Sequence, residues 1–125
     1  MAQELALIIE DNPSLSMLYS EALQIIGYRC ETILDGGEAE QALGRISPAI
    51  ILLDMNLPHI SGHYLYKQLC ADPRLSSVPV LIVTANAIIA DALRRELRPN
   101  DQILMKPVEI SQLHIAVKRA RAVQP

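Results

Sequence analysis

Two short apolar runs of this chain end directly on acidic residues. Residues 5–9 read Leu-Ala-Leu-Ile-Ile and precede Glu10 and Asp11, and residues 49–53 read Ala-Ile-Ile-Leu-Leu and precede Asp54. A short, uninterrupted apolar run is typical of a strand buried on both faces, as in a parallel sheet. The pattern therefore predicts two central strands whose carboxyl ends carry three acidic residues.

Strands and helices are predicted to alternate along the rest of the chain. Further strands are predicted at residues 28–34, 78–83 and 103–105, where apolar residues alternate or run together. Between the strands, apolar residues recur at helical spacing, and capping residues such as Asn12 precede them. The predicted helices are residues 13–26, 39–46, 62–71, 88–97 and 110–120.

This alternation predicts an α/β fold in which helices cover both faces of a five-stranded parallel sheet. We expect the doubly wound strand order 2-1-3-4-5, which places the carboxyl ends of strands 1 and 3 side by side. That order would bring Glu10, Asp11 and Asp54 together. Thr84 and Lys106, which follow the fourth and fifth strands, would flank them.

The composition is that of one globular domain with an aliphatic core. The chain has 125 residues, 50% of them hydrophobic, with no Trp or Phe, and this length is enough for a core without staples. We expect residues 1–125 to form a single domain. No apolar run approaches the ~18 residues of a membrane span, and the acidic N-terminus is unlike a signal peptide. We therefore expect a cytoplasmic protein without a membrane partner.

The last quarter of the chain is basic. Residues 91–125 hold seven basic and four acidic side chains, whereas residues 1–90 hold four basic and ten acidic. No aromatic residues are interleaved with the basic ones, so solvated helix faces are favoured over a nucleic-acid interface. The residues predicted to form this positive surface are Arg94, Arg95, Arg98, Lys118, Arg119 and Arg121.

The acidic cluster requires a compensating cation. Two unit charges ~4 Å apart repel by roughly 4 kcal/mol at an effective dielectric constant of ~20. Carboxylate oxygens without nearby His or Cys suit Mg²⁺, and Lys106 and Thr84 could bind the oxygens of a tetrahedral dianion beside it. A carboxylate in such a pocket can attack phosphorus and form an aspartyl phosphate.

Seven segments, in order and spacing, resemble the receiver domain of bacterial two-component response regulators, a flavodoxin-like fold. The likeness covers essentially all 125 residues. Its segments are Ile-Ile-Glu-Asp-Asn at 8–12, Leu-Leu-Asp-Met-Asn-Leu-Pro at 52–58, Ser-Gly at 61–62, Ala-Asp-Pro at 71–73, Val-Pro-Val at 78–80, Val-Thr-Ala at 83–85 and Met-Lys-Pro at 105–107.

The resemblance implies a role for each site residue. It assigns Asp54 as the phospho-acceptor and gives Mg²⁺ to the acidic pair Glu10 and Asp11, to Asp54 and to the backbone carbonyl of Asn56. A histidine kinase or a histidine phosphotransfer protein would donate the phosphoryl group. The domain would then be a signalling switch and not a conventional enzyme, limited to self-phosphorylation from small donors and autodephosphorylation.

The resemblance also implies how the signal would leave the site. Thr84 and Lys106 would bind phosphoryl oxygens, and the Lys106-Pro107 bond would be cis. Phosphorylation would reshape the face made by helix 4, strand 5 and helix 5, where a downstream protein would bind. Ile103, however, stands where many receivers carry a switch Tyr or Phe, and Arg98-Pro99-Asn100 replaces the usual Gly-Ala before strand 5.

Two other functions remain open at this stage. The missing switch aromatic at Ile103 favours a receiver-like interaction module that never uses phosphate. An aspartate-nucleophile phosphatase would need a second Asp two residues after the nucleophile, where this chain has Asn56. His59 and His63 are four residues apart, but Gly62 lies between them, and we expect exposed loop residues instead of a metal pair.

Overall fold

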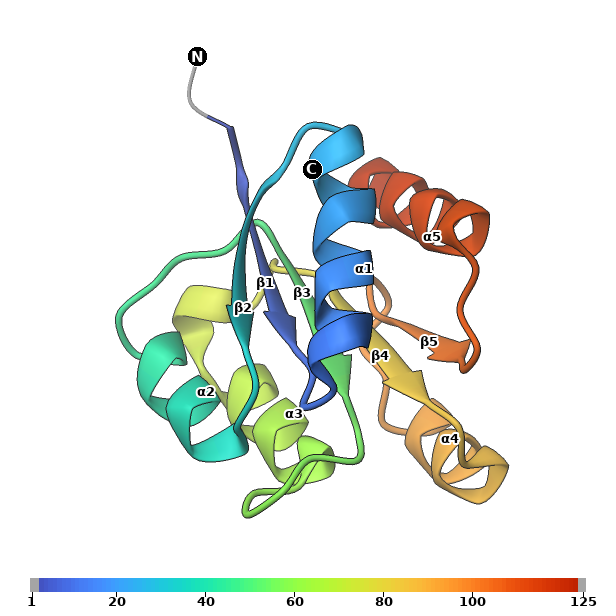
Figure 1. Ribbon diagram of the computed structural model, residues 1–125. Helices are drawn as coiled ribbons and strands as arrows, with labels where there is room; N and C mark the ends of the chain where they lie inside the picture. Colours follow the sequence, from blue (N-terminus) through green and yellow to red (C-terminus); the bar gives the residue numbers. More distant parts are fainter. Residues whose placement is uncertain (1–2, 124–125) are drawn as a thin grey trace.

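The sheet and its connections follow the predicted alternation. The computed structural model describes residues 3–123, in which five parallel strands have the order β2-β1-β3-β4-β5 (Figure 1). The strands are β1 Leu5–Ile9, β2 Arg29–Ile33, β3 Ile50–Asp54, β4 Val80–Thr84 and β5 Gln102–Met105. The helices are α1 Pro13–Ile25, α2 Gly36–Leu43, α3 Gly62–Ala71, α4 Ala87–Arg94 and α5 Ile110–Val123, with a 3-10 turn at Pro73–Leu75. The predicted fold class and strand order are confirmed.

The core has two apolar layers, one on each face of the sheet. Alternate residues of a strand point to opposite faces, so in β1 Ala6 and Ile8 pack with α1 and α5, whereas Leu7 and Ile9 pack with α2, α3 and α4. Figure 1 shows α1 and α5 on one side of the sheet, at the upper right, and α2, α3 and α4 on the other side, in the lower half. Burial on both faces explains why the central strands are uninterrupted apolar runs.

The strand register determines which residues meet at the carboxyl edge. Ile9 pairs with Leu53, so Glu10 follows β1 beside Asp54 at the end of β3. Asp54 in turn pairs with Val83, the residue before Thr84. The acidic residues and Thr84 therefore share one edge of the sheet, as the strand order predicts.

The second helix begins and ends earlier than predicted. It spans Gly36–Leu43 instead of 39–46, because Asp35 acts as its N-cap and its Oδ1 accepts hydrogen bonds from the backbone N–H groups of Gly37 (2.7 Å) and Glu38 (3.2 Å). Gly36 and Gly37 therefore lie in the first turn of α2.

The predicted loop placement of His63 is wrong, whereas His59 does lie in a loop. His63 lies in the first turn of α3, and its Nε2 contacts Glu96 Oε2 at 3.0 Å. His59 Nδ1 contacts Asp35 Oδ2 at 3.0 Å. Each ring therefore has its own carboxylate partner.

Arg98 is not part of a positive surface as predicted, because it is held in a buried polar cluster. Its Nε donates to Asp101 Oδ2 at 2.7 Å, and the guanidinium also donates to the carbonyl of Val78 at 2.8 Å. Asp101, itself buried, accepts from Tyr66 Oη at 2.6 Å and from the backbone N–H of Val80 at 2.8 Å. These contacts join α3 to the beginnings of β4 and β5.

Within residues 3–123, no helix has both the length and the apolarity that a membrane span requires.

Replacing Asp101 with Ala should strongly destabilise the fold. The change leaves the Tyr66 hydroxyl, the Val80 N–H and the Arg98 guanidinium without their buried partner, and we expect a loss of about 3 kcal/mol or more in the free energy of unfolding. Urea unfolding measures this loss. The matched control is Asp91→Ala, because Asp91 forms an exposed ion pair of the same i,i+3 type with Arg94. It should cost less than about 1 kcal/mol. Equal losses in the two variants would contradict the structural role of Asp101.

Candidate functional site

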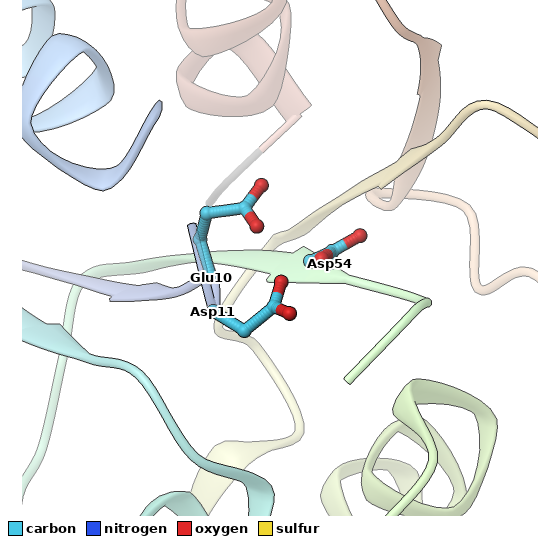
Figure 2. Close-up of side chains that lie close together, drawn as sticks. All are labelled: Glu10, Asp11 and Asp54. Atoms are coloured by element: carbon cyan, nitrogen blue, oxygen red, sulfur yellow. The ribbon is translucent and has the colours of Figure 1, made fainter. Parts of the chain in front are cut away.

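Three carboxylates gather where β1 and β3 end. Glu10, Asp11 and Asp54 each offer a carboxylate oxygen, and these oxygens lie within 4.8 Å of one another. Figure 2 shows the three side chains grouped at this edge of the sheet. Glu10 and Asp54 are buried, whereas Asp11 is exposed. Among residues 3–123, this is the one group of three or more metal-ligating side chains at that spacing.

Lys106 supplies the positive charge that faces the cluster. It follows β5, and its backbone N–H donates to the carbonyl of Thr84 at 2.9 Å. Its Nζ lies 3.0 Å from Glu10 Oε1 and 3.4 Å from Asp54 Oδ1. The Lys106-Pro107 peptide bond is cis, as the resemblance implied.

The proton affinities of the site reflect burial and charge together. Burial, followed by the neighbouring Asp54, raises the pKa of Glu10 from 4.5 to about 7, against the opposing hydrogen bonds of Lys106 and of the Asn12 N–H. Burial disfavours the charged form of Lys106, but the contacts with Glu10 and Asp54 outweigh it and raise the pKa of Lys106. Lys106 therefore stays protonated, but its single positive charge does not balance the three carboxylates.

The donor set fits a hard divalent cation. Asp54 Oδ2 is buried and has no hydrogen-bond partner among the described residues, and such an atom is costly unless something binds it. The neighbouring side chains of Glu10 and Asp11 offer further carboxylate oxygens, the ligands that Mg²⁺ prefers. The residues placed to hold the ion are Glu10, Asp11 and Asp54.

Thr84 connects the site to α4. Its side chain is buried at the end of β4, and its Oγ1 accepts a hydrogen bond from the backbone N–H of Asn86 at 3.1 Å. Asn86 is the N-cap of α4, because its Oδ1 accepts from the N–H groups of Ile88 (2.9 Å) and Ile89 (3.1 Å). A single hydrogen bond therefore links the Thr84 hydroxyl to the N-cap residue of α4.

The loop after β3 lies directly against the Asp54 carboxylate. The backbone N–H of Asn56 donates to Asp54 Oδ1 at 3.2 Å, while the Asn56 side chain is exposed. A Cβ atom at Gly62 would lie 2.5 Å from the carbonyl oxygen of Asp54 and 2.6 Å from Met55 Cα. Only glycine permits this close return of the chain, and the sequence carries no signal of that role beyond the residue type.

Comparisons with known proteins agree with this geometry. The chain matches the response regulator receiver domain family over residues 6–118. It is 31% identical over 112 residues to the DNA-binding dual master transcriptional regulator RpaA of Synechocystis, covering 90% of this chain and 46% of RpaA. It is 32% identical over 108 residues to the sensor histidine kinase RcsC of Salmonella typhi, covering 86% of this chain and 11% of RcsC. The chain thus spans about half of the regulator and a small part of the kinase.

A solved structure extends the likeness to the fold. The receiver domain of the sensor histidine kinase PA1611 from Pseudomonas aeruginosa, whose structure has a magnesium ion coordinated in the active-site cleft, superposes with a TM-score of 0.84 at 29% identity. The alignment covers 97% of this chain and 99% of that domain. The chain belongs to the response regulator receiver domain family of two-component signal transduction.

Proposed function

We propose that this domain accepts a phosphoryl group on Asp54 from a phosphohistidine, in a reaction that requires Mg²⁺, and that the acyl phosphate alters its binding to a downstream protein. The observation that carries the proposal is the buried Asp54 carboxylate. One of its oxygens has no hydrogen bond, and the other lies 3.4 Å from Lys106 Nζ. The donor would be a histidine kinase or a histidine phosphotransfer protein, and the reaction would take place in the cytoplasm.

Each residue of the site would have a distinct role in phosphoryl transfer. Asp54 Oδ2 is free to attack phosphorus, so that a P–O bond forms as the P–N bond of phosphohistidine breaks. Lys106 would bind one phosphoryl oxygen and the Thr84 hydroxyl another. Glu10, Asp11, Asp54 and the carbonyl of Asn56 would hold Mg²⁺. When bound, Mg²⁺ supplies positive charge that offsets the negative charge of the phosphoryl oxygens.

The route from the site to the surface would run through α4. If the Thr84 hydroxyl turns to a phosphoryl oxygen, its bond from the Asn86 N–H changes, and Asn86 caps α4. We propose that the downstream protein binds the face formed by α4, β5 and α5. Ile88, Met105 and Ile115 are 81%, 38% and 51% exposed, so each of the three elements offers an apolar side chain to such a partner.

Direct nucleic-acid binding is not part of the proposal. Three of the basic residues from the last quarter are neutralised within the fold: Arg94 pairs with Asp91, Arg98 with Asp101, and Arg121 with Glu4. The positive charge that remains exposed there is smaller than the sequence predicts. This pairing supports a protein partner for the domain.

A phosphorylation-independent interaction module is the second candidate function. Ile103 favours it, because this half-buried residue packs on the core side of β5 and offers no aromatic ring that could change position behind Thr84. The complete set of Asp54, Thr84 and Lys106 argues for the first candidate. A module that never used phosphate would gain nothing from the unpartnered Asp54 oxygen, which is a cost to stability.

Acetyl phosphate with Mg²⁺ should add one phosphoryl group to the wild-type protein, detected by intact mass. Asp54→Asn should abolish the addition, because an amide is not a nucleophile toward phosphorus. Asp91→Asn, which makes the same change in charge at an exposed site, should be labelled like the wild type. No mass increase in the wild type, under conditions that label another receiver, would contradict the proposal.

Glu10→Gln should stabilise the metal-free protein at alkaline pH but not at acid pH. Because the pKa of Glu10 is raised from 4.5 to about 7, the folded state binds the proton more tightly than the unfolded chain. Wild-type stability therefore falls as the pH rises through that interval. Relative to the wild type, the variant should gain about 2–3 kcal/mol between acid and alkaline pH, measured by urea unfolding in EDTA.

The control is Glu109→Gln, which makes the same change at an exposed site outside the acidic cluster and should lack the stabilisation expected of Glu10→Gln. At alkaline pH, added Mg²⁺ should stabilise the wild type more than Glu10→Gln, because the ion replaces the missing positive charge. A difference between Glu10→Gln and the wild type that stays constant across the pH range would contradict the shifted pKa.

Beryllofluoride, which mimics the phosphoryl group, should separate the two candidate functions. With Mg²⁺ present, it should move the amide resonances of residues 86–94 and 102–105 as well as those around Asp54, because Thr84 connects the site to the cap of α4. Asp54→Asn should show none of these changes. Shifts confined to the pocket would mean binding without output and would favour the phosphorylation-independent module.

A further inference from the structure

The loop between β3 and α3, residues 55–61, contains a residue in an unusual backbone conformation. His59 has a φ of 69°, and it is the one non-glycine residue with positive φ in the part of the chain that the structure describes. A side chain is disfavoured in this region of backbone space and persists there only where its surroundings hold it. The ring is 76% exposed, so burial does not hold it.

A hydrogen bond to α2 holds His59 in place. His59 Nδ1 lies 3.0 Å from Asp35 Oδ2. Asp35 is the N-cap of α2, and the N–H groups of Glu38 and Gly37 lower the pKa of its carboxyl. Asp35 is therefore an ionised acceptor, and the Nδ1–H of His59 donates to it. The two carboxylate oxygens of Asp35 have different partners. Oδ1 accepts from the backbone N–H groups that it caps at the start of α2, and Oδ2 accepts from His59 in the loop.

The same loop touches α2 at a second point. A Cβ atom at Gly36 would lie 2.7 Å from the carbonyl oxygen of Ile60 and 2.9 Å from Ile60 Cβ. The backbone of α2 and that of the loop are therefore in close contact immediately beside the His59–Asp35 bond. In Figure 1 the loop lies at the lower edge of the molecule, next to the beginning of α2.

The other end of the loop determines the position of the Asp54 carboxylate. The Asn56 N–H donates to Asp54 Oδ1 at 3.2 Å, and Gly62 lies against the Asp54 carbonyl. Asn56 and Gly62 are each three residues from His59 along the chain, and residues 55–61 contain no helix or strand. A loop released from α2 would therefore carry Asn56 away from Asp54.

We propose that the hydrogen bond between His59 and Asp35 fixes the β3–α3 loop on α2 and so holds the backbone of Asn56 where Mg²⁺ binding and phosphoryl transfer to Asp54 require it. His59 is a positioning residue, because its hydrogen bond is to Asp35 and not to Glu10, Asp11 or Asp54. The inference rests on the proposed function, since that function gives Asn56 its role.

The test compares variants that remove the bond with one that keeps it. His59→Gly removes the ring and relieves the backbone, and Asp35→Ser keeps a helix cap but has no second oxygen for His59. Asp35→Asn keeps the cap through Oδ1, and its Nδ2 can donate to Nδ1 of the other neutral tautomer of His59. The control is His63→Ala, which breaks a histidine–carboxylate contact of the same 3.0 Å length between α3 and Glu96 and leaves the contacts of the loop with α2 in place.

Magnesium affinity, measured by NMR titration, should fall about fivefold in His59→Gly and in Asp35→Ser, the factor that corresponds to one net hydrogen bond. With acetyl phosphate, both variants should need more Mg²⁺ to reach half-maximal rate but should reach the wild-type rate at saturation. Asp35→Asn and His63→Ala should match the wild type. Affinities within about twofold of the wild type for both loop variants, or an equal loss in His63→Ala, would overturn the inference.

A measurement on the metal-free protein separates this inference from the proposed function. The Asn56 amide resonance should move in His59→Gly and Asp35→Ser before any Mg²⁺ is added, and should return toward its wild-type position in Asp35→Asn. An unmoved resonance overturns the positioning role even if the wild type is phosphorylated. If the wild type binds no Mg²⁺ and takes up no phosphoryl group, the proposed function fails, and the displaced resonance still supports the tether.

Discussion

The contact of Lys106 with two buried carboxylates is the interaction on which the site depends. Glu10 and Asp54 come from neighbouring strands, and both are removed from water at the carboxyl edge of the sheet. A single ammonium group 3.0 Å from one and 3.4 Å from the other makes this burial tolerable. It does not balance the charge, because Asp11 adds a third carboxylate. Burial, followed by the neighbouring Asp54, raises the pKa of Glu10. The remaining deficit of positive charge supports the affinity for a divalent ion that we propose.

The two edges of the sheet differ in how well their buried polar groups are paired. At the amino edge of β4 and β5, Asp101, Arg98 and Tyr66 form a buried cluster in which the polar groups are well paired, and this anchors the strands. At the carboxyl edge, an oxygen of Asp54 has no partner, and loops surround it. A well-paired amino edge with an incompletely satisfied carboxyl edge would let the proposed phosphorylation site change state without unfolding the domain. It also places Arg98, from the unusual segment before β5, in the scaffold and not on the output face.

Output from the site has fewer routes than the family resemblance alone would imply. Ile103 has no aromatic ring, so the route that we propose from Asp54 to α4 relies on the hydrogen bond between Thr84 and Asn86, the N-cap of α4. The loop after β3 is the other segment in contact with Asp54, and its contacts with α2 at Asp35 and Gly36 restrain it. In this domain the phosphoryl group would therefore act chiefly on the β4–α4 side of the site.

The sequence by itself determined the strands, their order and the identity of the clustered acids. Uninterrupted apolar runs specify strands buried on both faces, and the parallel topology brings their ends together, so Glu10, Asp11, Asp54, Thr84 and Lys106 could be placed from local pattern and strand order alone. Only the tertiary structure decided the roles of Arg98, His59 and Gly62, and the true beginning of α2. Each of these depends on a contact between segments distant in the chain, such as His59 with Asp35 or Arg98 with Val78, or on the close approach of two backbones. Periodicity records which face of an element is buried, but it carries no information about which polar partner a loop residue will meet.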